Sequence, residues 1–308
     1  MLEIGLCMTV KDEEANIVAC LEPIADLFAQ IVVLDTGSTD ATCSLLRDRL
    51  GIEPVVAALA PCQCFSLAPL RNQGFDMLRT PWVLTLDADE RINRAELEAV
   101  MALDDADLPD ALFLGWDTDM GGGDLVEDYK ASLFRKGNLH QGLIHDTVQP
   151  SLRETGATAM WTSAMRILHL PDPARAAEKD DRYAWRLACA RQRDPDWLRY
   201  QWFSGYMAYR QGRLDEASAL LRMVHDGRPA RFPVESLNAS MILASIHARL
   251  GRRADAEAVL EDAAAYCGRV RDDFEVAVNF RLPGWLDGAA ERAARGDLDG
   301  IRPYAFPY

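Results

Sequence analysis

The chain has 308 residues, and its 49% apolar and 26% charged content is typical of a globular protein with one large domain or two ordinary ones. The formal net charge of −15 lies in residues 1–175, which hold 13 Lys+Arg and 28 Asp+Glu, whereas residues 176–308 hold 20 of each. The acidic part repels phosphate, which excludes nucleic acid as an unaided partner, and the uneven charge indicates two units.

The first 90 residues alternate strand and helix patterns. Short apolar, partly β-branched runs predict strands, and apolar residues at helical spacing predict helices. The predicted strands are residues 4–10, 31–34, 53–58 and 82–86, and the predicted helices are residues 13–28, 40–50 and 67–78. This order predicts an α/β fold with a mainly parallel sheet and helices on both of its faces.

The next segment is mixed. Residues 111–116, 130–135 and 164–169 have the apolar pattern of further strands. Residues 117–128 are polar and contain the glycines at 121–123, so they predict a mobile loop.

After about residue 173 the pattern is helical throughout. Helices at 201–211 and 214–225, and again at 237–250 and 254–266, are each separated by a Gly-Arg pair, and residues 289–298 predict the start of a third pair. Recurring helix pairs of this kind indicate tetratricopeptide-like repeats, with an ordinary helical bundle as the alternative. We therefore expect an α/β domain in residues 1–173 and an all-α domain in residues 174–308.

Neither a membrane span nor an export signal is expected. No segment approaches the ~20 apolar residues that cross a bilayer, so membrane contact should be at most peripheral. The first ten residues predict a strand without a basic leader, and the seven cysteines are an odd number, which favours reduced thiols and a cytoplasmic location.

Acidic residues follow two of the predicted strands. Asp35 directly follows the run 31–34. Asp87 directly follows the run 82–86, and Asp89 lies two residues further on. Parallel sheets bind ligands beyond the carboxyl ends of their strands. Two carboxylates two residues apart suit a hard divalent cation that also holds a substrate phosphate. A solvated loop after the strand is the alternative.

Several motifs appear in a fixed order along the chain. They are residues 8–14 (MTVKDEE), residues 35–40 (DTGSTD), Arg71-Asn72, residues 87–90 (DADE), residues 133–135 (LFR), residues 142–146 (GLIHD) and residues 167–169 (ILH). Together they resemble the inverting family-2 glycosyltransferases with a GT-A fold, in the bacterial branch with C-terminal tetratricopeptide-like helices. The resemblance covers nearly the whole chain. It departs at Asp12, where the family usually has Asn, and at Asp146, where this branch commonly has Glu.

The resemblance implies a nucleotide-binding role for five residues. Thr9 and Glu14 match positions that contact the base and ribose, Asp35 matches a uracil or ribose contact, Arg71 a nucleotide or diphosphate contact, and Asp87 a ribose contact. Three of these positions have structural alternatives. Glu14 could be a solvated acid at a helix start, Asp35 a turn residue, and Arg71 a partner in a surface ion pair.

The resemblance also implies a metal site and a base. Asp89 would bind Mn²⁺ or Mg²⁺ together with the diphosphate, and His169 would complete the metal shell unless it is a core histidine. Asp146 is the expected general base, with Glu127 and Asp128 as rivals, and Glu90 is expected to orient its neighbours.

The implied function is that of a cytoplasmic, metal-dependent, inverting glycosyltransferase. Its donor would be a nucleotide-sugar, expected to be a UDP-sugar, and its acceptor a hydroxyl of a glycan, a lipid-linked molecule or a peptide. The helical domain would recognise the acceptor or a protein partner. One alternative is a helical-repeat scaffold with an inactive nucleotide-binding domain. The other is a nucleotidyltransferase. The acidic segment 11–14 (KDEE) disfavours it, because that class usually has a Gly-rich loop containing Lys or Arg there.

Overall fold

The computed structural model describes residues 1–57, 66–121, 123–279, 281–303 and 306, and within these it omits the side chains of residues 173–182 and 278. The chain divides into two compact units, Met1–Ala176 and Ala177–Phe306. Each unit is described by itself.

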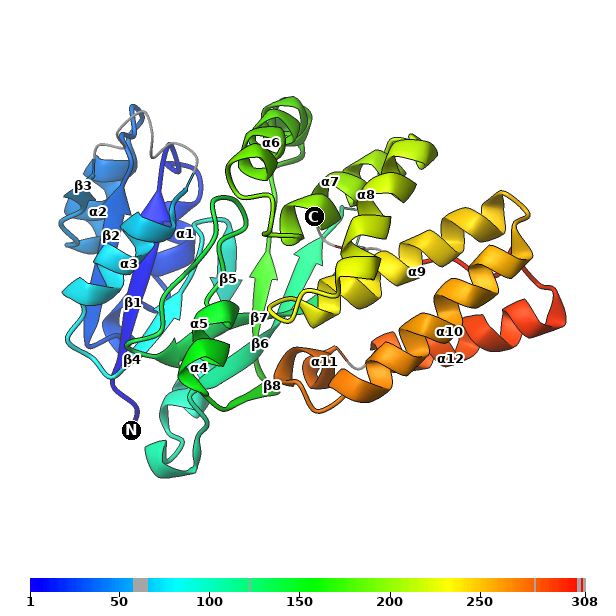
Figure 1. Cartoon of the computed structure of the whole chain (residues 1–308). Helices are drawn as coiled ribbons and strands as arrows, with labels where there is room; N and C mark the ends of the chain where they lie inside the picture. Colours follow the sequence, from blue (N-terminus) through cyan, green and yellow to red (C-terminus); the bar gives the residue numbers. More distant parts are fainter. Residues whose placement is uncertain (58–65, 122, 280, 304–305, 307–308) are drawn as a thin grey trace. The chain divides into compact units, whose positions relative to one another are not determined.

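The first unit is built on an eight-stranded sheet with the order β3-β2-β1-β4-β7-β6-β8-β5 (Figure 1). The strands are β1 Ile4–Val10, β2 Gln30–Asp35, β3 Val55–Val56, β4 Trp82–Thr85, β5 Glu90–Ile92, β6 Ala111–Asp119, β7 Leu125–Arg135 and β8 Ala159–His169. Pairing is parallel for β1 with β2 and β4, for β2 with β3, and for β6 with β8. The predicted mostly parallel sheet is therefore confirmed. Residue 58 of the predicted strand 53–58 lies outside the described residues.

The predicted mobile loop at 117–128 is wrong. Strand β6 continues to Asp119 and β7 begins at Leu125, so most of this segment is an antiparallel hairpin. Its turn contains Gly121 and Gly123, with φ values of +88° and +92° that favour glycine. The hairpin escaped prediction because polar residues occupy both of its faces, which removes the apolar alternation of an ordinary strand.

Helices cover both faces of this sheet. They are α1 Ile17–Leu21, α2 Thr42–Leu50, α3 Ala68–Met77, α4 Arg94–Met101 and α5 Gln149–Thr155, with 3-10 turns at Ala25–Leu27 and Asp105–Asp107. The helix predicted at 13–28 is much shorter, because Pro23 has no backbone N–H to continue the ladder beyond α1.

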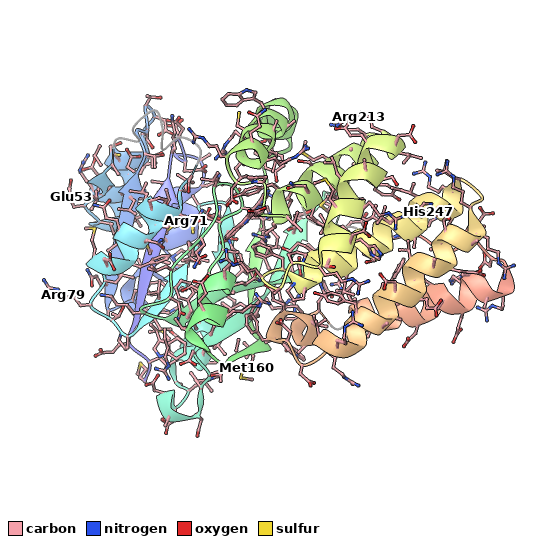
Figure 2. The ribbon with its side chains drawn as sticks, viewed as in Figure 1. Glu53, Arg71, Arg79, Met160, Arg213 and His247 are labelled. Carbon is pink, nitrogen blue, oxygen red and sulfur yellow. The ribbon has the colours of Figure 1, made fainter. Side chains whose placement is uncertain are left out.

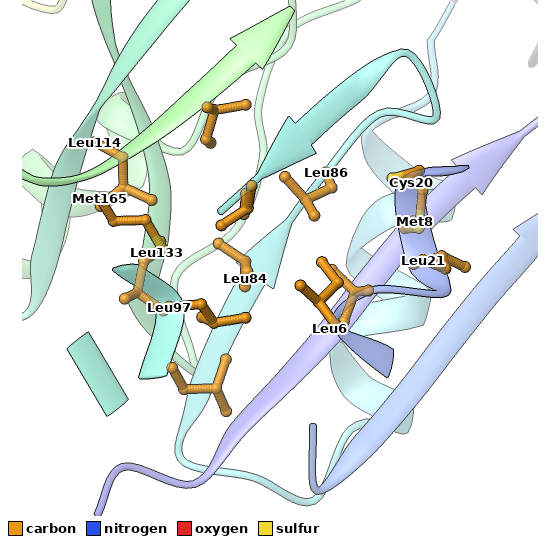
Figure 3. Packing of buried hydrophobic residues seen from close by; sticks show 14 of the residues in the cluster. Leu6, Met8, Cys20, Leu21, Leu84, Leu86, Leu97, Leu114, Leu133 and Met165 are labelled. Carbon is orange, nitrogen blue, oxygen red and sulfur yellow. The ribbon is translucent and has the colours of Figure 1, made fainter. Parts of the chain in front are cut away.

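One face of the sheet holds the main apolar core. Alternate residues of β1, among them Leu6 and Met8, pack with Leu21 of α1, Leu84 of β4 and Leu97 of α4 (Figure 3). Each of these side chains is fully or almost fully buried. Because strand side chains alternate between faces, the intervening residues of β1 point to the opposite side.

Helix α3 covers that opposite face at close range. A Cβ atom added to Gly74 would lie 2.5 Å from Cys7 Sγ and 2.8 Å from Leu34 Cδ1. These distances are far inside van der Waals contact, so the absence of a side chain at Gly74 allows α3 to approach β1 and β2. The helix then carries Arg71, one turn earlier on the same face, toward the ends of the strands.

The second unit is helical. It contains α7 Arg199–Arg210, α8 Leu214–Gly227, α9 Pro233–Arg249, α10 Arg253–Val270, α11 Phe274–Val278 and α12 Arg281–Arg295, preceded by α6 Pro173–Arg193, which spans the boundary of the units. Two helix pairs, α7–α8 and α9–α10, turn at Gly212 and Gly251, whose φ values are +75° and +67°. These are the two predicted pairs.

Helix α9 lies at the centre of the second unit. It packs against α7, α8, α10, α11 and α12, and its side chains from Glu235 to Ala248 are buried. The predicted third helix pair is wrong, since residues 289–295 end α12 and no helix follows in residues 296–303. Among the described residues, none of the helices is both long and apolar enough to cross a membrane.

Candidate functional site

The acidic motif at residues 87–90 forms the turn between β4 and β5. Glu90 N donates to Asp87 O at 3.0 Å, which closes the turn. Strand β5 pairs antiparallel with β8, and Glu90 is the register partner of His169. This pairing brings Asp89 and His169 together, with 3.5 Å between Asp89 Oδ2 and His169 Nε2.

The imidazole of His169 is held on two sides. Thr118 Oγ1 lies 3.1 Å from its Nδ1, and the ring stacks on Trp116 at 4.8 Å with an interplanar angle of 16°. Bonding at Nδ1 leaves Nε2 directed at Asp89, the arrangement that orients a metal-binding histidine. The side chains of Asp89 and His169 are 24% and 18% exposed, so a ligand can reach both.

This carboxylate–imidazole pair fits a divalent cation as part of its shell. In the described part of the chain, no group of three or more His, Cys, Asp or Glu residues could hold a metal ion. Asp89 and His169 are thus two candidate donors at this place. Sites for Mg²⁺ commonly use one or two carboxylates, with a substrate phosphate and water completing the shell.

Asp87 lies between two cations. Its Oδ2 is 3.2 Å from Lys130 Nζ and its Oδ1 is 3.4 Å from Arg71 Nη2. Burial raises the pKa of this carboxyl, but the charges of Lys130 and Arg71 outweigh it and hold the pKa well below its usual range. Asp87 is therefore ionised, and its charge is balanced inside the site.

Glu90 is fully buried beside Asp87. Its Oε1 accepts from Lys130 Nζ and from Trp116 Nε1, both at 2.7 Å, and its Oε2 accepts from the backbone N–H of Asp87 at 2.9 Å. Burial raises the pKa of Glu90, and Lys130 opposes that rise.

A second ion cluster joins α3 to the segment after β7. Arg71, labelled in Figure 2, donates from Nη1 to Asp146 Oδ2 at 3.1 Å, and His140 Nδ1 lies 2.7 Å from the same oxygen. Burial raises the pKa of Asp146, but Arg71 and His140 hold it well below its usual range. Burial lowers the pKa of His140, so a neutral ring donates to Asp146 from Nδ1.

Asp35 is nearly buried and bonds within its own turn. Its Oδ2 accepts from the backbone N–H groups of Gly37 and Ser38, each at 3.1 Å, and its Oδ1 accepts from Ser38 Oγ at 2.5 Å. This is the structural alternative for Asp35. Its predicted nucleotide contact stays a prediction.

Thr9 and Glu14 lie at the end of β1 and beyond it. Thr9 Oγ1 is buried with no hydrogen-bond partner in the described residues. Glu14 Oε2 accepts from Ala41 N at 2.9 Å, and Glu14 N donates to Asp40 Oδ2 at 3.0 Å, so Glu14 ties the end of β1 to the start of α2.

The two rival bases lie on opposite faces of the β6–β7 hairpin. Asp128 is the register partner of Trp116, and Glu127 is the register partner of Asp117, which pairs with Arg166. Register partners share a face. Asp128 is therefore on the face that carries Trp116, whereas Glu127 is on the other.

Sequence reasoning missed Lys130, Trp116 and His140. One signal was available for Lys130, since residues 128, 130 and 132 are polar at the spacing of one strand face. Trp116 looked like an ordinary core residue at the end of a predicted strand. No pattern distinguished His140, because its contact with Asp146, which Arg71 shares, is formed only in the folded chain.

Comparison with known proteins agrees with this architecture. The crystal structure of S. aureus TarS 1-349 in complex with UDP-GlcNAc is similar in fold, with a TM-score of 0.50, 11% identity and coverage of 96% of this chain and 92% of that one. The first unit is thus a GT-A sheet with acidic residues at the ends of its strands.

The family is shown by a sequence model. The model for glycosyl transferase family 2 matches residues 6–159, half of the chain. The chain belongs to glycosyl transferase family 2.

Two curated relatives match over shorter segments. A TPR repeat-containing protein of Synechococcus elongatus is 34% identical over 92 residues, which are 30% of this chain and 22% of that protein. The lipopolysaccharide core biosynthesis glycosyltransferase LpsC of Rhizobium meliloti is 30% identical over 93 residues, 30% of this chain and 33% of that protein. The matched segments thus span a third or less of either relative.

Proposed function

We propose that this chain transfers a sugar from a nucleotide-sugar, most simply a UDP-sugar, to an acceptor hydroxyl with inversion at the anomeric carbon. The observation that carries the proposal is the facing pair Asp89 and His169, set beside the charge-balanced Asp87 at the ends of the strands. The family match supports transfer from a nucleotide-sugar, and the UDP-GlcNAc complex of TarS supports UDP as its nucleotide.

In this proposal Asp89 and His169 hold Mn²⁺ or Mg²⁺. The cation would supply charge neutralisation for the departing nucleoside diphosphate. Asp87 would fix the ribose, and Asp35, Thr9 and Glu14 would contact the base or ribose from the ends of β1 and β2. An acidic site needs such positive charge before it can receive a diphosphate.

Arg71 forms ion pairs with two carboxylates. It contacts Asp87 and Asp146, and we propose that it turns to the diphosphate when the donor binds. Losing Arg71 would raise the pKa of Asp146, because an opposite charge is removed from a buried carboxylate. Asp146 would then accept the acceptor proton as general base. Asp128 is the rival, since it shares the Trp116 face.

We also propose a separate role for each of the two units. Residues 1–173 would be the transferase domain, and residues 174–308 a tetratricopeptide-like domain that recognises the acceptor or a protein partner. The acceptor is a glycan, a lipid-linked molecule or a peptide. A cytoplasmic location and at most peripheral membrane contact stay predictions.

The test is donor binding with and without the cation. UDP affinity of the wild type is measured by calorimetry in Mn²⁺ and in EDTA, and compared with Asp89→Ala. The exposed helical acid Asp48 provides the matched control Asp48→Ala. We expect Mn²⁺ to tighten UDP binding for the wild type and the control only. Equal Mn²⁺ dependence in Asp89→Ala would exclude this site.

The alternative functions give other results. A scaffold with an inactive nucleotide-binding domain would show no hydrolysis or transfer from any nucleotide-sugar under any divalent metal. A nucleotidyltransferase would release pyrophosphate from a nucleoside triphosphate and a sugar phosphate.

A further inference from the structure

The carboxylate of Glu90 joins the two halves of the candidate site. Toward Asp87 it accepts from Lys130 Nζ, which also contacts Asp87 Oδ2, and from the backbone N–H of Asp87. The oxygen that accepts from Lys130, Oε1, also accepts from the indole of Trp116, whose ring stacks on His169. Three donors on one buried carboxylate satisfy it, which offsets much of the cost of burying the charge.

The bond from Trp116 fixes the plane of the His169 ring. Nε1 is the one hydrogen-bond donor of an indole side chain, and it is directed at Glu90 Oε1 at 2.7 Å. The hydrogen bond at this edge favours one orientation of the indole, and the indole in turn supports the imidazole stacked on it. Thr118 Oγ1 holds the same imidazole at Nδ1, which leaves Nε2 directed at Asp89.

Lys130 contacts both Asp87 and Glu90. Its ammonium lies between Asp87 and Glu90, and 5.6 Å from the centre of the Trp116 ring. A displacement of Glu90 would therefore release Lys130 and Trp116 together. Glu90 itself is fully buried, so it is not placed to touch the donor.

We propose that Glu90 and Trp116 are positioning residues that set His169 Nε2 opposite Asp89, and that Lys130 is a separate link that positions Asp87. The proposal rests on the proposed function, because its subject is the geometry of the donor site. It predicts that the two links can be broken independently. Removing the Trp116–Glu90 hydrogen bond should weaken cation binding, and removing the Lys130 ammonium should weaken nucleotide binding.

The test uses Trp116→Phe and Lys130→Met in the full chain. Phenylalanine keeps an aromatic face for His169 and removes the donor to Glu90, and Trp185→Phe in α6 is the matched control at an exposed tryptophan. UDP affinity is measured by calorimetry in EDTA and in Mn²⁺, and free Mn²⁺ is counted by electron paramagnetic resonance at fixed UDP.

We expect Trp116→Phe to lose roughly 10-fold to 100-fold of the Mn²⁺-dependent affinity, as changes to residues behind metal ligands do, while UDP affinity in EDTA matches that of Trp185→Phe. Lys130→Met should weaken UDP binding equally in EDTA and in Mn²⁺. Glu90→Gln should show both losses, and it replaces Trp116→Phe if that variant does not fold.

The outcomes separate the two proposals. A wild type whose UDP affinity does not respond to Mn²⁺ overturns the proposed function, and this inference falls with it. A wild type that responds, together with a Trp116→Phe or Glu90→Gln variant that responds to the same extent, overturns the positioning role alone. Thermal melts of each variant show whether a loss of binding reflects unfolding.

Discussion

Arg71 and Asp146 are 75 positions apart in the chain, yet Arg71 Nη1 lies 3.1 Å from Asp146 Oδ2. The same guanidinium reaches Asp87 at 3.4 Å. One cation from α3 therefore lies between the carboxylate proposed to fix the ribose and the carboxylate proposed to accept the proton. Its exchange of partners would link donor binding to the readiness of the base.

Replacing Arg71 with lysine should weaken donor binding. Lysine keeps the charge but has no fork of donors, so it cannot serve two carboxylates or a diphosphate in the same way. We expect UDP-sugar affinity to fall by about tenfold or more, measured by calorimetry, in line with the ~1.5–3 kcal/mol of one hydrogen bond to a charged group. An unchanged affinity would show that Arg71 is only structural.

The base can be identified by a matched pair of substitutions. Asp146→Asn should lower kcat by ~10²–10⁴-fold, the usual contribution of a general base, whereas Asp146→Glu should retain much of the activity because this branch of the family commonly has Glu there. Asp128→Asn is the control on the Trp116 face. A large loss in Asp128→Asn with an active Asp146→Asn would reverse the assignment.

Asp146 should also make the fold sensitive to acid. Its pKa in the folded protein lies below the ordinary value of 3.8, so the unfolded chain takes up the proton first as the pH falls. The stability it contributes is therefore complete above about pH 5 and is lost as the pH falls toward the folded pKa.

Urea unfolding between pH 6 and pH 3 measures this contribution. Over that range the free energy of unfolding of the wild type should fall by roughly 1 kcal/mol more than that of Asp146→Asn. Parallel curves for the two proteins would mean that the ion pair with Arg71 does not form in solution.

The parallel half of the fold could be predicted because its signals are local. Strands β1, β2 and β4 are apolar runs with acidic residues at their ends, so Asp35 and Asp87 could be placed at one edge without knowledge of the sheet order. Asp89 and His169 could be paired only through the family resemblance, and the structure places them 3.5 Å apart.

Strands at 111–116, 130–135 and 164–169 could be predicted from their apolar pattern, and they lie within β6, β7 and β8. The contacts of the antiparallel half could not be predicted, because its residues acquire their environment from pairing over long distances. Lys130 is a strand residue among polar neighbours, and only the register of β7 beyond β4 brings it to Asp87. His140 is buried by aromatic neighbours from other elements, Phe75 and Phe134. Such contacts leave no periodicity in the sequence.

Gly74 provides a test of core packing with an internal control. Gly74→Ala should destabilise the first unit by about 1–3 kcal/mol, because the new methyl group overlaps Cys7 and Leu34. Gly268→Ala in α10, where nothing lies within 4 Å, should instead stabilise the chain by roughly 0.5–1 kcal/mol through helix propensity. Thermal melts compare the two, and equal shifts would contradict the close approach of α3.

The close approach of α3 to the sheet at Gly74 also affects how the charged site can differ between related proteins. Arg71 and Gly74 are one turn apart on α3. The distance between α3 and the sheet therefore determines how far the Arg71 guanidinium extends over Asp87 and Asp146. Substitutions in the core beneath α3 would therefore shift the Arg71 guanidinium by fractions of an ångström, without a change in any charged residue. Related chains with the same charged residues would in this way differ in donor preference through their cores.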